Sequence, residues 1–295
     1  MIFLARRYSP TRRDRVVLQD AAANSVSIAA NIPVRILISH KDRKILSIFA
    51  FGTRKTAMTQ SEIKFVRSLR DRKVRDAEGL FVVEGEKMVA EAVASALEVV
   101  SVFRASETGP KAMERITNLS SPSPVLAVVR KPEPDFSVPG PGLYLALDSL
   151  RDPGNLGTVI RIADWFGIKR IFASEDSVDV FNPKVVQSTM GAIFRVGITY
   201  TSIPGLCRSV AGGGGKVYGT FLDGSNLYGQ DLDNGISSPS VIVIGNEAHG
   251  ISKETAREVT HRLYIPPYPG DTPGSESLNA AVATAITVAE FRRRG

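Results

Sequence analysis

Short apolar runs alternate with helical patterns through the second half of the chain. The runs are rich in aliphatic and β-branched residues and predict strands, whereas apolar residues spaced three and four positions apart between them predict helices. The strands are predicted at 143–147, 170–173, 217–222, 241–244 and 263–265. The helices are predicted at 156–166, 184–190, 253–259 and 278–293. This alternation predicts an α/β domain whose mainly parallel sheet carries helices on both faces.

A smaller α/β unit precedes this domain. Phe65, Val66 and Leu69 lie at helical spacing, and a second helix is predicted at 86–97. The same unit also contains β-rich runs. Those runs, predicted as strands, are 81–85, 97–103 and 125–129. Prolines and glycines then recur at a density that neither a helix nor a central strand tolerates. We therefore expect a small domain at 58–129, a linker at 130–142 and a larger domain at 143–295.

The basic residues are concentrated in an N-terminal extension. The net charge is +7, but residues 1–57 carry eight Arg and three Lys against three Asp, while the remainder holds 26 basic and 27 acidic side chains. Net charge therefore gives only weak support to nucleic-acid binding. The extension shows no sustained period and has three interpretations: a flexible basic arm for RNA phosphates, an organelle-targeting segment, or sequence upstream of a start at Met58. We expect it to be poorly ordered or foreign to the native protein.

Cys207 is the only cysteine, which excludes an intramolecular disulfide and a cysteine-based metal cluster. It lies in the apolar stretch 203–210, where a lone thiol is usually a small core residue. No apolar run approaches the roughly 18 to 20 residues that a membrane span needs. We expect a cytoplasmic protein that neither holds a metal nor crosses a membrane.

The first of three chemically interesting segments follows the strand at 143–147. Pro153-Gly154 turns the chain, and Asn155 is placed to cap the helix that follows. Arg161 comes six residues later, so it does not share a helix face with Asn155. Alone, this pattern favours a capped helix with a solvated arginine.

The second segment begins where the strand at 241–244 ends. Gly245 and Gly250 flank Asn246 and Glu247, and Ser252 can cap the next helix. Ligands of open α/β sheets bind at the carboxyl ends of strands, and glycines let a ligand approach the backbone. A tight strand-to-helix turn is the alternative, but a carboxylate at the mouth of a sheet needs a partner.

In the third segment, the strand at 263–265 ends in prolines, a polar loop follows, and Ser277 begins an alanine-rich helix. Small side chains permit close packing of that helix against another backbone. A plain helix start is the alternative interpretation.

Together and in this order, the three segments resemble the SpoU (TrmH-like) RNA 2'-O-ribose methyltransferases of the SPOUT class. The resemblance rests on Asn155 with Arg161, on Gly245-Asn246-Glu247 with Gly250, and on Ile265-Pro266 with Ser277-Leu278-Asn279. Residues 190–195 also resemble the family. Residues 75–85 resemble the start of the small substrate-binding domain that many members carry.

The resemblance implies a SPOUT-type sheet with a C-terminal trefoil knot, S-adenosylmethionine as cofactor, RNA as substrate and a homodimer. The implied catalytic residues are Arg161, Asn155, Glu247, Ser277 and Asn279. The implied cofactor-binding residues are Thr220, Phe221, Leu222, Gly245, Asn246, Ile265 and Leu278. The family's proposed general base is Arg161, although a guanidinium with a pKa above 12 is better suited to stabilising negative charge.

The densest basic cluster after the extension predicts an RNA-phosphate contact in the small domain. Its members are Lys64, Arg67, Arg70, Arg72, Lys73 and Arg75. The alternative is a solvated helix face paired with Asp71 and Asp76. The additional domain favours ribosomal RNA as substrate by analogy with the family. Transfer-RNA methylation and a non-catalytic RNA-binding protein on the same scaffold remain alternatives. A nucleotide-dependent oxidoreductase is disfavoured because the Gly-x-Gly-x-x-Gly turn is missing after the first strand.

Overall fold

The structure is a computed structural model that describes residues 58–269 and 277–293. The chain divides into two units, residues 1–47 and 48–295, and the second holds every described residue. The predicted basic extension at 1–57 lies outside the described residues.

A three-stranded antiparallel sheet with the order β1-β3-β2 forms the small α/β part. Its strands are β1 (Leu80–Glu84), β2 (Val99–Arg104) and β3 (Val125–Arg130). Its helices are α3 (Gln60–Ser68), α4 (Arg72–Glu78), α5 (Glu86–Ala94), α6 (Ala105–Thr108) and α7 (Pro110–Ile116). Thr59 and Glu62 close a capping box at the start of α3, which satisfies two backbone donors at that end.

A six-stranded sheet with the order β6-β5-β4-β8-β7-β9 forms the larger part, and every one of its pairings is parallel. Its strands are β4 (Gly142–Leu147), β5 (Arg170–Ala173), β6 (Gly197–Tyr200), β7 (Lys216–Asn226), β8 (Pro239–Ile244) and β9 (His261–Tyr264). Its helices are α8 (Pro153–Trp165), α9 (Pro183–Ser188), α10 (Ile203–Gly212), α11 (Lys253–Ala256) and α12 (Ala280–Arg293), with short 3-10 turns η1 (Ala192–Phe194) and η2 (Leu227–Gly229).

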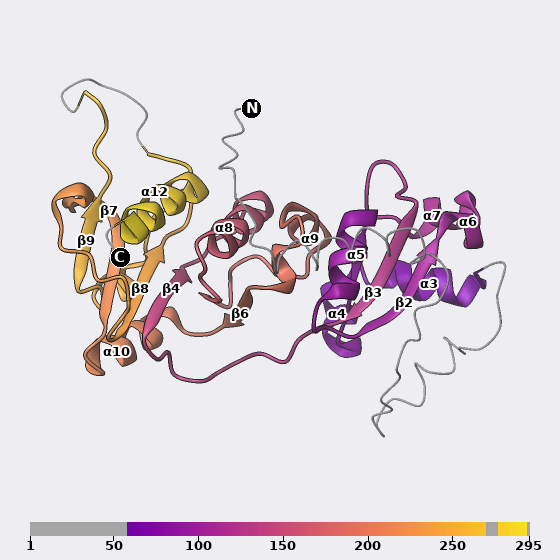
Figure 1. Cartoon of the computed structure of the whole chain (residues 1–295), viewed down its shortest axis with the longest axis horizontal. Coiled ribbons are helices and arrows are strands. Elements are labelled where there is room, and N and C mark those ends of the chain that lie inside the picture. Colours follow the sequence, from indigo (N-terminus) through magenta and orange to yellow (C-terminus); the bar gives the residue numbers. More distant parts are fainter. Residues whose placement is uncertain (1–57, 270–276, 294–295) are drawn as a thin grey trace, which may run out of the picture. The chain divides into compact units, whose positions relative to one another are not determined.

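Both faces of this sheet are covered, as predicted. Alternate strand residues point to opposite faces, so Leu145 and Ile242 join one core while Ala146 and Val243 join another. The first core includes α8, α9 and α12, and the second includes α10. On the first face α8 and α12 pack against each other (Figure 1).

The chain reverses its direction of growth at the centre of the sheet. From β4 it adds β5 and then β6 on one side, and afterwards it places β8 and β7 on the other side of β4. The adjacent strands β4 and β8 therefore flank a topological switch point, where open parallel sheets bind their ligands at the strand carboxyl ends.

Five predicted strands and four predicted helices of the larger part are confirmed, with shifted ends. The prediction missed β6, which lies at the sheet edge, and α10. Within the described residues no helix is long and apolar enough to span a membrane. The division into domains at 58–129 and 143–295 and the trefoil knot stay predictions.

Candidate functional site

The carboxylate of Glu247 gathers the first two segments into one cluster at the switch point. Glu247 lies just after β8, and its Oε1 accepts hydrogen bonds from the Asp152 backbone N–H (3.1 Å) and from Nδ2 of Asn155 (3.0 Å). Its Oε2 accepts a longer one from the Arg151 backbone N–H (3.4 Å). We expected this carboxylate to need a partner, and the loop after β4 together with Asn155 provides it.

Asn155 occupies a different position from the predicted one. The N-cap of α8 is Asp152, whose side chain accepts from the Asn155 backbone N–H at 2.8 Å, and Pro153 follows at the first helical position. The expectation that Asn155 caps the helix is therefore wrong. Because Asp152 satisfies the helix end, the Asn155 amide is free to point toward Glu247, and the residue is only 8% exposed.

The third segment joins the cluster through Asn279. Its Nδ2 donates to Oδ1 of Asn155 at 2.8 Å, and its own Oδ1 accepts from the backbone N–H groups of Ala281 and Val282. Asn279 therefore holds the start of α12, which begins at Ala280 and not at Ser277 as predicted. Ser277 is exposed and makes no hydrogen bond with any described residue, so the described contacts do not bring it into the cluster.

These contacts keep Glu247 ionised. Burial acts to raise the pKa of its carboxyl, but the hydrogen bonds from Asn155 and from backbone N–H groups outweigh burial and hold the pKa below its ordinary value of 4.5. A fixed negative charge thus lies at the switch point at neutral pH, and the loop and helix after β4 supply donors to it from Arg151, Asp152 and Asn155.

Arg161 lies two turns further along α8. Its side chain is exposed, and among the described residues it has neither a hydrogen bond nor an ion pair. A guanidinium offers five donors in a planar fork suited to phosphate and oxyanion groups. Arg161 is thus available to a substrate, whereas Asn155, Glu247 and Asn279 are occupied with one another.

The loop after β8 is shaped by its own backbone. A Cβ at Gly245 would lie 2.2 Å from the carbonyl carbon of Gly250, so the loop needs a glycine at this position to fold back on itself. Asn246 and Gly250 exchange two backbone hydrogen bonds of 2.9 Å. The Asn246 side chain also donates to the Ser149 carbonyl at 2.7 Å and accepts from the backbone N–H groups of Ala248 and His249, so it holds the loop together.

The predicted cofactor-binding residues follow neighbouring strands. Gly245 follows β8, Ile265 follows β9, and Thr220 to Leu222 lie where the pairing of β7 with β9 is interrupted. Because β8, β7 and β9 are neighbours in a parallel sheet, these segments share one edge. Leu222 and Leu278 are 73% and 48% exposed, which leaves apolar surface beside this edge.

The predicted basic cluster divides into two kinds of residue. Lys64, Arg67 and Lys73 are exposed and make no side-chain ion pair with any described residue, while Arg72 forms an exposed i,i+4 pair with Asp76. Arg70 donates to the Thr117 carbonyl. These residues stay candidates for RNA contact.

Arg75 does not belong with them. It is 2% exposed, its Nη2 contacts Asp179 at 2.7 Å, and its Nη1 donates to the Leu69 and Arg70 carbonyls. An arginine so enclosed cannot reach a phosphate, so its inclusion in the RNA-binding set is wrong. Its partner lies 104 positions away, which no local pattern reveals.

The sequence also missed Ser149, which follows β4 with a φ of 61°. A left-handed backbone is uncommon outside glycine. Ser149 holds this conformation between the Asn246 amide on its carbonyl and Ser174 Oγ, which accepts from its N–H at 2.8 Å. No signal in the sequence marks this strained residue, although it sets the direction of the loop that binds Glu247.

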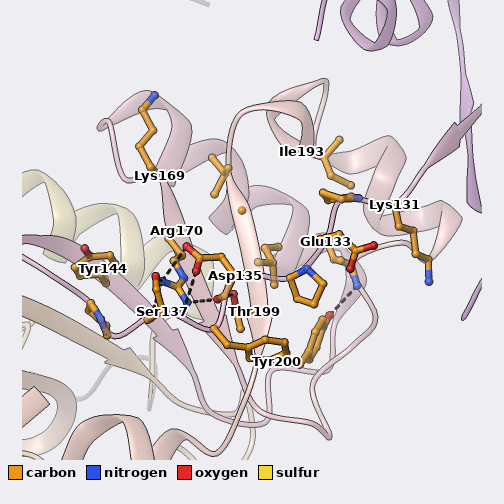
Figure 2. A pocket seen from close by; sticks show the side chains of 18 of the residues that line it. Lys131, Glu133, Asp135, Ser137, Tyr144, Lys169, Arg170, Ile193, Thr199 and Tyr200 are labelled. Atoms are coloured by element: carbon orange, nitrogen blue, oxygen red, sulfur yellow. Dashed lines mark hydrogen bonds and ion pairs between the residues drawn. The ribbon is translucent and has the colours of Figure 1, made fainter. Parts of the chain in front are cut away.

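A cavity of about 630 Å³ lies elsewhere, between the linker and the edge strand β6. Figure 2 shows Arg170 pointing toward Asp135 and Ser137 of the linker, and Nη1 of Arg170 donates to both oxygens of Ser137. None of the residues lining this cavity belongs to the three segments, so we do not place the chemistry there.

Comparison with known proteins agrees with this geometry. The model of the SpoU rRNA Methylase family matches residues 142–289, and that of the MRM3-like substrate binding domain matches residues 60–131. The 23S rRNA (guanosine(2553)-2'-O)-methyltransferase RlmP of Bacillus subtilis (strain 168) is 30% identical over 246 residues, which cover 78% of this chain and 96% of that protein. Mouse (Mus musculus) rRNA methyltransferase 3, mitochondrial, is 26% identical over 297 residues, covering 77% of this chain and 70% of that protein.

Solved structures match over the same extent. A TrmH-family protein from Porphyromonas gingivalis superposes with a TM-score of 0.72 at 39% identity, covering 81% of this chain and 99% of that one. The AdoMet-bound rRNA methyltransferase from Sinorhizobium meliloti gives a TM-score of 0.71 at 30% identity, covering 81% of this chain and 97% of that one. The chain therefore belongs to the SpoU rRNA methylase family.

Proposed function

We propose that the protein transfers the methyl group of S-adenosylmethionine to a ribose 2'-hydroxyl of ribosomal RNA. The observation that carries this proposal is the cluster of Asn155, Glu247 and Asn279 at the switch point. Arg161, which has no partner among the described residues, lies on the same helix as Asn155. The 2'-O activity of the Bacillus subtilis relative and the AdoMet bound by the Sinorhizobium meliloti relative support it.

The carboxyl ends of β8, β7 and β9 suit S-adenosylmethionine. Main-chain groups at Gly245, Thr220 and Ile265 can pair with the polar edges of adenine and ribose, and exposed Leu222 and Leu278 offer apolar contact. This donor set fits a neutral nucleoside and explains the lack of a phosphate-binding glycine turn. When bound, S-adenosylmethionine supplies an electrophilic methyl group.

The residues of this chain then have separable tasks. Arg161 holds the ribose or a neighbouring phosphate and stabilises negative charge that develops on the attacking 2'-oxygen. A guanidinium does not accept a proton at neutral pH, so charge stabilisation is its better role. Asn155, held between Glu247 and Asn279, fixes α8 and thereby the position of Arg161. Orientation of this kind can supply several kcal/mol of barrier reduction.

We also propose a cytoplasmic homodimer. Trp165 at the end of α8 is 84% exposed, and Val282 on the neighbouring helix α12 is 47% exposed. These two exposed side chains offer apolar surface on α8 and α12 for a second subunit to cover. Light scattering at several protein concentrations tests the dimer, and a monomer at every concentration would exclude it.

Two measurements test the function. Calorimetry should detect S-adenosylmethionine binding to the full chain, and mapping of 2'-O-methylation in total RNA from cells with and without the gene should reveal a ribosomal site that depends on it. Loss of a methylated site in transfer RNA would instead identify transfer RNA as the substrate. Absence of cofactor binding would leave a non-catalytic RNA-binding protein and refute the proposal.

A further inference from the structure

A buried carboxylate in the small α/β part is committed to a single loop. Glu84, the last residue of β1, is 4% exposed. Its oxygens accept from the Thr117 hydroxyl (2.6 Å), the Asn118 backbone N–H (2.7 Å) and the Asn118 side-chain amide (2.9 Å). A buried carboxylate is costly without such partners, so the three bonds fix the chain at Thr117 and Asn118 in one conformation.

The loop that Glu84 fixes forms one wall of a groove of about 350 Å³, and α9 forms the other. Asn118 and Ser120 contribute from the loop, and Lys184, Gln187 and Ser188 contribute from α9. The lining thus combines amides, hydroxyls and one cation with the apolar side chains of Leu119 and Pro183, and it holds no carboxylate. Lys184 is exposed, and within the described residues its ammonium group makes no ion pair.

The groove adjoins the candidate site. Ser188 Oγ donates to the carbonyl of Pro153, the first residue of α8, at 3.2 Å. A Cβ at Gly157 would lie 1.8 Å from the same Ser188 oxygen, so α8 and α9 touch directly at this point. Pro153 and Gly157 are four positions apart and share one face of α8, and Arg161 continues that face four positions later, whereas Asn155 lies on another face. A chain lying in the groove therefore meets the face of α8 that carries Arg161.

Ion pairs join the two α/β parts that supply the walls. Arg75 of α4 pairs with Asp179, which precedes α9, at 2.7 Å, and both side chains are at least 90% buried. Glu91 of α5 pairs with Arg195 at 2.7 Å, and Arg195 also contacts Asp164 of α8 at 2.9 Å. Both pairs join the small α/β part to the larger one within a single unit of the chain.

We propose that this groove binds the RNA strand next to the target nucleotide and that Glu84 is the positioning residue for its loop wall. Lys184 contacts a phosphate, while the Gln187 amide and the Asn118 carbonyl oxygen hydrogen-bond to a base edge. Lysine contacts to phosphates position a nucleic acid, and side-chain amides recognise base edges. Single-stranded RNA leaves its base edges exposed. The inference rests on the proposed function, because it assigns part of the RNA path to that site.

Binding of RNA without cofactor tests the groove directly. The probe is ribosomal RNA from cells that lack the gene, titrated with the full chain. Lys184→Gln and Gln187→Ala should each raise the Kd for RNA about fivefold to tenfold and raise the KM for RNA in parallel, with S-adenosylmethionine affinity unchanged. Lys111→Gln, an exposed lysine of α7 outside the groove, is the charge-matched control and should stay within twofold of wild type. Equal behaviour of the groove variants and this control would overturn the proposal.

Glu84→Gln and Thr117→Val test the positioning role. Both should speed hydrogen exchange of the loop amide at Asn118 and raise the KM for RNA, while kcat changes less than twofold. A purely structural role would lower folded protein and kcat and leave KM unchanged, which would overturn the assignment. The second variant keeps the Glu84 carboxylate and removes only the Thr117 hydroxyl, which donates to Glu84 and accepts from the Leu119 N–H, so it serves if the first does not fold.

The two proposals fail separately. Groove-dependent RNA binding by a wild-type chain that transfers no methyl group would support the groove and refute the function. Methyl transfer that is indifferent to Lys184 and Gln187 would retain the function and overturn the groove.

Discussion

Replacing Asn155 by Asp removes the donor that holds Glu247 and sets a second carboxylate against it. The Nδ2 to Oε1 distance is 3.0 Å. A hydrogen bond to a charged group contributes about 1.5 to 3 kcal/mol, and two charges at that distance repel by about 1.4 kcal/mol in water-like surroundings. Because Glu247 is exposed, solvent screening reduces the total, and we expect a loss of about 2 kcal/mol in the free energy of unfolding at pH 7.

The pH dependence of this loss identifies its cause. In the wild type, Glu247 has a lowered pKa, so its contribution to stability is complete above its ordinary value of 4.5 and is lost as the pH falls through the folded value. In Asn155→Asp, one of the paired carboxyls takes up a proton on acidification, which relieves the repulsion and restores a donor. The difference between variant and wild type should therefore shrink from about 2 kcal/mol at pH 7 to below about 1 kcal/mol at pH 4.

Urea unfolding followed by circular dichroism at both pH values measures these differences. Asn226→Asp is the matched control, since Asn226 caps η2 through its side-chain oxygen and Asp caps as well. It adds the same charge and should change stability by less than about 0.5 kcal/mol. A loss for Asn155→Asp that is equal at pH 7 and pH 4, or no larger than the control's, would refute the charge-paired cluster.

Three further outcomes follow from single residues. Arg161→Ala should lower kcat by about 10²- to 10³-fold while the thermal midpoint stays within about 1 °C. Arg161→Lys should recover little of this activity because lysine lacks the planar fork. A loss of kcat explained by a matching loss of folded protein would contradict this role. Gly245→Ala places a Cβ 2.2 Å from a backbone atom of Gly250, so it should cost at least about 1 to 3 kcal/mol in urea unfolding, whereas Gly229→Ala, in open space, should cost less than about 1 kcal/mol. Burial raises the pKa of the Cys207 thiol to about 12, so at pH 8 a thiol-specific reagent should label the native protein roughly a thousandfold more slowly than the urea-unfolded chain. Rapid labelling of the native protein would show that this thiol is accessible.

The elements that the sequence predicts well are those whose side chains are buried in a regular pattern. β8 is buried at five of its six positions, so its apolar run is unmistakable. β6 has one buried residue in four, because it is a sheet edge, and its polarity hides it. The first turn of α10 contains Pro204-Gly205, which locally resembles a turn, although Pro is favourable at the start of a helix.

The residues of the candidate site could be predicted from the sequence, but the hydrogen bonds between them could not. The resemblance selects Asn155, Glu247 and Asn279, yet the contacts that join them span 92 and 124 positions and depend on strand order. The cap of α8 was predictable, since Asp152 directly precedes Pro153 and that pair is a usual helix start. The burial of Arg75 was not, because its carboxylate partner belongs to the other α/β part.

The geometry also sets when the site becomes complete. Glu247 and Asn155 meet because β4 and β8 are neighbours, but Asn279 reaches them only when α12 has docked. α12 is anchored at its opposite end, where Phe291 is fully buried with its ring 4.8 Å from that of Tyr218 and Arg292 donates to the Phe166 carbonyl. Since a 14-residue helix is about 20 Å long, packing at that distance determines where the Asn279 amide lies. The polar cluster is therefore complete only when the last helix of the described chain has packed, because until then Asn155 lacks the hydrogen bond from Asn279.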